Sequence, residues 1–172
     1  VSTITELVAG QIRGLHQGED RLVMLMGRHP PLSGTAPSLD DYLAWPHLQV
    51  SGGGDKDSPV EQVLAPLGLS RRWFARVPFF QAAVEVLLRT DCLMTTPAHI
   101  AWQLSREHAL SFCDLPFATR VQQYHLLWHQ RHHLDPAHRW FRELAYPFLR
   151  DHLQRTLGES RKQLGLKADP LR

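Results

Sequence analysis

Histidines are the residues with the most obvious chemical potential, because five of them gather in one region: His125, His129, His132, His133 and His138. Neutral imidazole is a common ligand of zinc and other transition metals, so such a group invites the interpretation of a metal site. The spacing, however, matches no zinc signature, and no cysteine lies near these residues. We therefore expect surface and hinge positions for these side chains, with no metal and no other cofactor.

The sequence has few of the motifs that are typical of nucleophilic or acid–base catalysis. It contains no Gly-x-Ser-x-Gly elbow, no His-Glu-x-x-His and no Cys-x-x-Cys. Asp40 and Asp41 are adjacent at a helix start, so they point in different directions and serve as capping charges. Cys92 and Cys113 lie inside apolar runs, where a thiol is usually inert packing. We expect no enzyme, although a small α/β enzyme stays open as an alternative because catalytic triads are spatial, not sequential.

Two turns rich in small polar residues could hold a ligand. Ser51 and Gly52 begin a glycine loop that runs to Asp55 and precedes a helix, and backbone N–H groups in such a loop can bind an anion. An ordinary surface loop is the alternative. Thr95 and Thr96 lie at a second turn, where their hydroxyls could bond a ligand. Capping of the helix that follows explains at least one of these two hydroxyls without any ligand.

A third turn, Pro78-Phe79-Phe80-Gln81, combines aromatic rings with an amide. It lies where a strand ends and a helix begins, and ligands of open α/β folds bind at the carboxyl ends of strands. Phe79 could stack on an aromatic or apolar ligand, and Gln81 or a backbone N–H could bind a carboxylate. The alternative is that Phe79 and Phe80 both belong to the core.

The elements that must position these turns alternate between short apolar runs and short amphipathic segments. The apolar runs predict buried strands at 21–26, 47–50, 73–77, 91–95, 109–113 and 121–128. Capping hydroxyls, carboxylates and prolines predict helix starts at Ser38, Ser58, Pro78, Thr96 and Asp135. This alternation predicts an α/β fold with a mostly parallel sheet.

The last helix is expected to be the longest. It begins at Asp135-Pro136, and we expect one apolar side made of Trp140, Phe141, Leu144, Phe148, Leu149 and Leu153. The tail after Gly158 is polar and is expected to fray.

Composition limits the class of protein. The chain has 172 residues, of which 43% are hydrophobic and 21% charged, which is typical of a globular protein and not of a disordered or fibrous one. The formal net charge of +2 is too small for a stand-alone nucleic-acid-binding protein. No run approaches the roughly 18 apolar residues that a bilayer span needs. Two unpaired cysteines and the lack of a signal sequence at the start lead us to expect a cytoplasmic protein without membrane contact.

Ordered sequence matches point to a family. Glu19-Asp20-Arg21-Leu22-Val23, followed by Arg28-His29-Pro30, resembles the "DRLV…HP" segment of LysR-type transcriptional regulators. Further segments resemble the middle, the last strand and the final helix of the effector-binding domain of that family, in the same order: 48–51, 67–72, 76–78, 126–129 and 135–140. The resemblance covers roughly residues 12 to 155.

The resemblance implies a fold and a domain division. The fold would be the α/β fold of periplasmic-binding proteins of type 2, with two lobes and a small-molecule effector in the cleft between them. Residues 1–20 would be a remnant of lobe one and the crossover, 21–120 would be lobe two, 121–157 would be the return strand and last helix of lobe one, and 158–172 a polar tail. The first part of lobe one and the N-terminal DNA-binding domain would not be included.

The resemblance also implies a function. The chain would be the effector-sensing, oligomerising region of a bacterial regulator that contacts DNA only through the domain not included. The effector would be a small, anionic or aromatic molecule bound by the three turns, at Ser51, Gly52, Phe79, Phe80, Gln81, Thr95 and Thr96. The homodimer interface would involve Phe79, Ala82, Ala83, Val86 and Leu93. We expect altered pairing and an exposed apolar patch, since the partner half of lobe one is not included. A solute-binding protein of the same fold is the main alternative.

Overall fold

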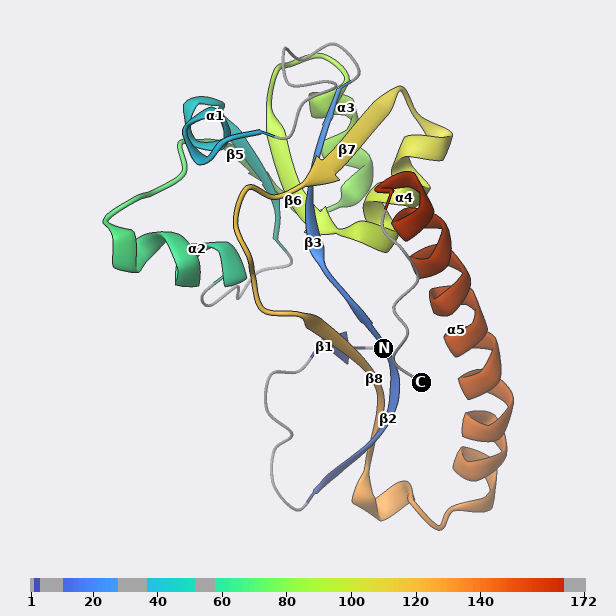
Figure 1. Ribbon diagram of the computed structural model, residues 1–172. Coiled ribbons are helices and arrows are strands. Elements are labelled where there is room, and N and C mark those ends of the chain that lie inside the picture. Colours follow the sequence, from blue (N-terminus) through green and yellow to red (C-terminus); the bar gives the residue numbers. More distant parts are fainter. Residues whose placement is uncertain (1, 4–10, 28–36, 52–57, 166–172) are drawn as a thin grey trace. The chain divides into compact units, whose positions relative to one another are not determined.

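The computed structural model describes residues 2–3, 11–27, 37–51 and 58–165 of the chain. These residues form two compact units, which are coloured by sequence in Figure 1. Unit 2 is the continuous segment 21–120, whereas unit 1 combines residues 1–20 with residues 121–172. Each unit has its own sheet, and each is described separately below.

Unit 2 is built on a five-stranded mixed sheet. Its strands are β3 (Leu22–Gly27), β4 (His47–Val50), β5 (Trp73–Val77), β6 (Leu93–Pro97) and β7 (Leu110–Asp114), in the spatial order β5-β4-β6-β3-β7. β4 is parallel to β5 and to β6, but β3 is antiparallel to both of its neighbours. The expectation of a mostly parallel sheet was therefore wrong. An apolar run shows that a strand is buried on both faces, but it carries no information on strand direction.

Four helices cover the two faces of this sheet. They are α1 (Leu39–Ala44), α2 (Pro59–Leu64), α3 (Phe80–Leu87) and α4 (Ala98–Glu107), and a 3-10 turn, Ala65–Leu67, follows α2. α1 and α2 lie on one face, and α3 and α4 lie on the other (Figure 1). Ser38 caps α1 through a capping box with Asp41, as the sequence predicts. Ser58 likewise accepts a bond from Val60 N–H at the start of α2.

The core of unit 2 follows the pleat of β3, an interior strand of the sheet. Met24 and Met26 pack with residues of α1 and α2, among them Tyr42 and Leu64, in one buried cluster. Val23 and Leu25 alternate with the methionines and are also fully buried, so they face the side of α3 and α4. Burial on both faces explains why the sequence of β3 is uniformly apolar.

Unit 1 contains a small antiparallel sheet with the strand order β1-β8-β2, formed by β1 (Ser2–Thr3), β2 (Ile12–Asp20) and β8 (Gln122–His129). β2 pairs with β8 along its whole length, from Ile12 opposite His129 to Asp20 opposite Gln122. The sequence analysis missed β2. Its buried residues include Gln17 and Asp20, so it lacks the apolar pattern that reveals a strand.

The long helix α5 (Pro136–Gln163) completes unit 1. It continues through Gly158, so the expectation that the chain frays after this residue was wrong for residues 159–163. The helix buries Leu153 as expected and also Leu157, which was not on the expected apolar side, whereas Trp140, Phe141, Leu144 and Phe148 are all exposed. The inward positions in the first turns are instead Arg142, which is buried, and Ala145 and Tyr146, which are half-buried. The expected apolar side is thus split between two faces of the helix.

No helix within the described residues is long and apolar enough to cross a membrane.

Candidate ligand-binding site

The segments singled out in the sequence lie at the ends of three strands of one parallel set: Ser51 follows β4, Pro78 follows β5, and Thr95 and Thr96 are in the last part of β6. Val50 pairs with Val77, and Leu48 pairs with Met94, so β4, β5 and β6 end at nearly the same level. The backbone N–H of Ser51 donates to Val77 O at 2.9 Å, which ties Ser51 to the end of β5. Parallel strands have their carboxyl ends at one edge of the sheet, and ligands of α/β folds bind at that edge. We call it the strand-end edge.

The turn before α3 presents an aromatic ring to solvent. Phe79 is the N-cap residue of α3, its backbone is extended, and its side chain is 70% exposed. No side chain caps this helix, and Gln81 in the first turn is also exposed. Phe80 is half-buried, so only one of the two phenylalanines is free to stack on a ligand.

The threonines of the second turn do not cap a helix. Pro97 occupies the N-cap position of α4, and no side chain caps the helix there, so the expectation of a threonine cap was wrong. Thr95 and Thr96 belong to β6 and point to opposite faces of the sheet. Thr96 is buried, and its hydroxyl has no hydrogen-bond partner among the described residues. Only the half-buried Thr95 can offer its hydroxyl to a ligand on the α1 side.

The hydroxyl of Thr95 is oriented by a buried polar network that the sequence analysis missed. The Tyr42 hydroxyl lies 2.7 Å from Thr95 Oγ1, and Arg71 Nη1 donates to the Tyr42 oxygen at 3.4 Å. Tyr42 and Thr95 each carry a hydroxyl proton, and either one can donate in the bond between them. Burial raises the pKa of the Tyr42 phenol, which keeps Tyr42 protonated. A ligand at Thr95 can therefore find either an acceptor or a donor, depending on which hydroxyl donates to the other.

Arg71 links this network to α2. Its guanidinium donates to both carboxylate oxygens of Glu61, at 2.8 and 2.7 Å, and to Ser58 Oγ at 3.4 Å. The side chain of Arg71 is only 3% exposed, and it also lies over the Trp73 ring at 4.3 Å. The capping box at Ser38 fixes the phase of α1 and could have revealed Tyr42 as an inward residue. Nothing in the sequence distinguishes Arg71 from its exposed neighbour.

His47 forms a hydrogen bond with the backbone of Tyr42. Its side chain is fully buried, and its Nε2 lies 2.7 Å from Tyr42 O, so Nε2 carries the proton and donates to this carbonyl. Burial lowers the pKa of His47 to about 4. His47 is thus neutral at physiological pH and acts as a structural hydrogen-bond donor.

The remaining expected residues divide into accessible and buried ones. Gly52 and the rest of the glycine loop lie outside the described residues. Ala82 and Val86 are half-buried on α3, whereas Ala83 and Leu93 are fully buried within unit 2. The side chains of Ala83 and Leu93 therefore have no exposed surface. The dimer interface as a whole stays a prediction.

The histidines and cysteines within the described residues are candidate metal ligands. No group of three or more potential metal ligands is found in the described part of the chain. His132 and His138 stack with their ring centroids 4.2 Å apart, which is a ring contact and not a ligand arrangement. Burial raises the pKa of the Cys113 thiol to about 11, so this cysteine stays protonated and is a poor nucleophile.

Comparison with known proteins shows to which family the chain belongs. Residues 5–150 match the family model of the LysR substrate-binding domain. The chain is 25% identical over 153 residues to the transcriptional activator NahR of Pseudomonas putida, covering 85% of this chain and 51% of NahR. It is 31% identical over 113 residues to nodulation protein D 1 of Sinorhizobium fredii, covering 62% of this chain and 34% of that protein. The chain thus spans about half of the length of NahR and about a third of that of nodulation protein D 1.

Solved structures show the same fold. The regulatory domain of MexT, a transcriptional activator in Pseudomonas aeruginosa, superposes with a TM-score of 0.70 at 28% identity, over 87% of this chain and 71% of that one. The effector-binding domain of QuiR in complex with shikimate has a TM-score of 0.64 at 15% identity, over 82% of this chain and 66% of that one. The fold is therefore the α/β fold of type 2 periplasmic-binding proteins, as the resemblance implied.

Proposed function

The chain belongs to the LysR substrate-binding domain family, and we propose that it senses a small-molecule effector for a transcriptional regulator. Its role is regulatory and not catalytic, as the names of its relatives also suggest. A DNA-binding segment outside this chain would act on the promoter, and the protein would work in the cytoplasm.

The observation that carries this proposal is the set of groups at the strand-end edge of unit 2. Phe79, with its exposed ring, and Gln81, with its exposed amide, lie at the start of α3. Ser51 is hydrogen-bonded to Val77 at the end of β5, the strand that precedes α3. On β6, the half-buried hydroxyl of Thr95 is held by its hydrogen bond with the Tyr42 hydroxyl, at 2.7 Å. A ring surface combined with neutral donors favours an effector that has a flat apolar part and a carboxylate.

The mechanism would be a shift in population. An effector that binds one conformation of the protein more tightly raises the share of that conformation by its difference in affinity. Here the groups that touch the effector are rigidly held, since Thr95 is fixed through Tyr42 to Arg71 and Glu61. Binding at the strand-end edge would therefore shift the positions of α1 and α2 through these hydrogen bonds, without a large rearrangement of the core.

Ligand screening followed by substitution tests this proposal. We expect a small carboxylate, found by thermal shift in a panel that includes shikimate, to bind about 5-fold more weakly to Phe79→Ala, because a stacked ring contributes on the order of 1 kcal/mol. Phe148→Ala is the matched control, since Phe148 is 75% exposed on α5 in unit 1. Equal affinity of the two variants would contradict a site at the strand-end edge.

The second part of the proposal concerns self-association. We infer that the outer face of α3 is a homodimer contact, centred on Phe79, Ala82 and Val86, which are the accessible members of the expected interface. Val86→Glu places a charge on this face and is expected to weaken dimerisation at least 10-fold in sedimentation equilibrium. Val121→Glu, at an exposed valine that belongs to unit 1, is the control. A dimer unaffected by Val86→Glu would exclude this face.

A further inference from the structure

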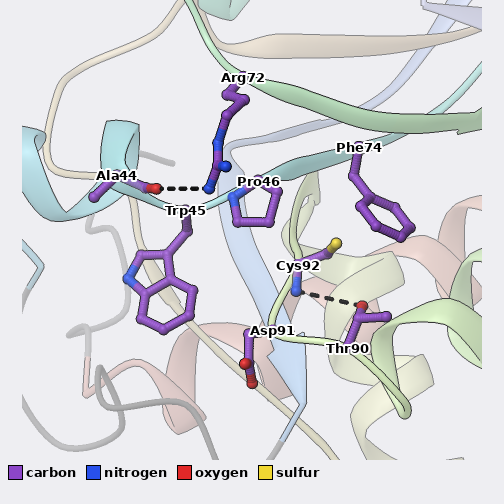
Figure 2. Close-up of a pocket in the computed structure, with 8 residues that line it drawn as sticks. All are labelled: Ala44, Trp45, Pro46, Arg72, Phe74, Thr90, Asp91 and Cys92. Atoms are coloured by element: carbon purple, nitrogen blue, oxygen red, sulfur yellow. Dashed lines mark hydrogen bonds between the residues drawn. The ribbon is translucent and has the colours of Figure 1, made fainter.

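A second hollow lies at the opposite edge of the same three parallel strands. It is formed where the chain enters β4, β5 and β6, and its volume is about 590 Å³. Its lining includes Trp45, Pro46, Arg72, Phe74, Asp91 and Cys92, shown as sticks in Figure 2. None of the residues of the strand-end edge takes part. We call this hollow the strand-start pocket.

The floor of the strand-start pocket is held by backbone hydrogen bonds among its three segments. Leu93 N donates to Pro46 O at 2.9 Å, and His47 N donates to Arg72 O at 2.7 Å. The Thr90 hydroxyl accepts from Cys92 N at 3.4 Å and donates to Val86 O at 2.8 Å, which ties the pocket to the end of α3. A floor fixed in this way is preorganised, so a ligand would bind without the cost of ordering loops.

The middle of the pocket is apolar. Trp45 is half-buried and packs on the core cluster, and Phe74 is 54% exposed on the other side. Pro46 and the thiol group of Cys92 lie between them (Figure 2), and Cys92 is only 1% exposed. Two rings on either side of a small apolar floor suit a flat hydrocarbon ring, which gains from stacking and from leaving water.

One end of the pocket carries an unneutralised guanidinium. Arg72 Nη2 donates to Ala44 O at 3.2 Å, and within the described part of the chain Arg72 makes no ion pair. Its Nε and Nη1 donors therefore remain for a ligand, and a guanidinium binds carboxylates through two parallel hydrogen bonds. Asp91 lies at the far end from Arg72 in Figure 2 and disfavours a second negative charge there.

From this arrangement we propose that the strand-start pocket binds an aromatic monocarboxylate. The ring lies over Pro46 and Cys92, between Trp45 and Phe74, and the carboxylate pairs with Arg72. The site is separate from the strand-end edge, so it does not depend on the function proposed above.

Titration of the full 172-residue chain with benzoate, followed by ¹H–¹⁵N NMR, tests this proposal. We expect saturable shifts of the Trp45 indole N–H and of the Asp91 and Cys92 amides. Arg72→Gln is expected to weaken this binding at least 10-fold, whereas Arg76→Gln is expected to leave it unchanged. Arg76 is the matched control because it is exposed on β5, the strand that Arg72 directly precedes, over the Trp73 ring and outside the pocket. Benzyl alcohol and terephthalate should each bind at least 10-fold more weakly than benzoate.

The same spectra identify the results that would overturn the proposal. No saturable shift at Trp45 and Cys92, equal losses in Arg72→Gln and Arg76→Gln, or equal binding of benzyl alcohol would each exclude it. If Arg72→Gln disturbs the fold, Phe74→Ala takes its place, because it removes one wall and leaves the charge. Shifts confined to residues 79–81 that vanish in Phe79→Ala would assign benzoate to the strand-end edge alone. If Phe79→Ala loses the shifts at residues 79–81 but keeps the shift of the Trp45 indole N–H, benzoate binds at both places and the proposal for the strand-start pocket is supported.

Discussion

Several polar and titratable residues of unit 2 are buried around Tyr42, where an unpaired charge would be unfavourable. A phenol, a guanidinium, a carboxylate and an imidazole meet beside an apolar core, yet Arg71 is paired by Glu61 and His47 is neutral. Buried charges are stable only when they are paired, and buried titratable groups otherwise take their neutral form. The pairing of Arg71 with Glu61 and the neutral state of His47 each lead to a prediction.

The first prediction concerns the ion pair between Glu61 and Arg71. Glu61→Gln leaves the guanidinium of Arg71 buried without a counter-charge, so we expect a loss of about 3 kcal/mol in the free energy of unfolding. The double variant Glu61→Gln/Arg71→Met removes the stranded charge and should recover most of this loss. Glu85→Gln breaks an exposed pair with Arg89 and should cost less than about 1 kcal/mol. Chemical denaturation measures all three, and a cost for Glu61→Gln no larger than for Glu85→Gln would refute the argument.

The second prediction concerns the pH dependence that His47 imposes. Its folded pKa of about 4 lies below the ordinary value of 6.5, so the unfolded chain takes up the proton more readily. The contribution of neutral His47 is therefore complete above pH 6.5 and is lost as the pH falls toward 4. Between pH 7 and pH 5.5 the loss should be about 1 kcal/mol. Denaturant midpoints at the two pH values should show this loss in the wild type, but not in His47→Gln.

A surface histidine provides the control for that measurement. His152 is exposed on α5, so His152→Gln should keep the wild-type dependence on pH. An unchanged dependence in His47→Gln would mean that other groups cause the loss of stability in acid.

At the scale of elements, close approach between a strand and a helix sets a strict limit on side-chain size. A Cβ added to Gly27 at the end of β3 would lie 2.9 Å from the backbone oxygen of Leu87, the last residue of α3. We expect Gly27→Ala to lower the free energy of unfolding by about 1–3 kcal/mol, since a backbone atom must move. Gly158→Ala, in open space within α5, should instead raise it by about 0.5–1 kcal/mol. Thermal unfolding of the two variants should give shifts of opposite sign, and shifts of equal sign would contradict the packing described.

The elements also show what the sequence could and could not predict. The bounds of the strands in unit 2 were predicted to within a few residues, because a strand that is buried on both faces needs consecutive apolar residues. β2 was missed because Gly14, Gly18 and buried polar residues interrupt any such run, and its stability comes from backbone pairing with β8. Strand direction and the inward face of α5 were wrong because both depend on neighbours that are distant in sequence.

The candidate site shows the same division between local and distant information. Capping rules located α1, and the strand-end turns were singled out because loops after parallel strands meet at one edge. Arg71 was missed because its partners, Tyr42 and Glu61, belong to other elements. The threonine cap was wrong because β6 extends to Pro97, two residues beyond its expected end.

At the scale of the whole molecule, the two units differ in how the chain builds them. Unit 2 is one continuous segment whose ends are tied within the unit, since Ala98 N donates to Arg21 O and Arg21 pairs with Asp114. Unit 1 needs two distant segments, because β2 comes from residues before unit 2 and β8 from residues after it. Continuity lowers the entropic cost of assembling unit 2 relative to unit 1.

This difference predicts that residues 21–120 fold in isolation. The segment keeps all five strands of its sheet and the helices on both faces, so its buried core is complete. We expect a dispersed NMR spectrum whose amide shifts for β3 to β7 overlay those of the full chain, and a single cooperative unfolding transition. Residues 121–172 alone lack β2, which pairs along the whole of β8, and should show no protected strand amides in hydrogen exchange. A fragment 21–120 that binds hydrophobic dyes and lacks dispersed signals would show instead that the core of unit 2 depends on unit 1.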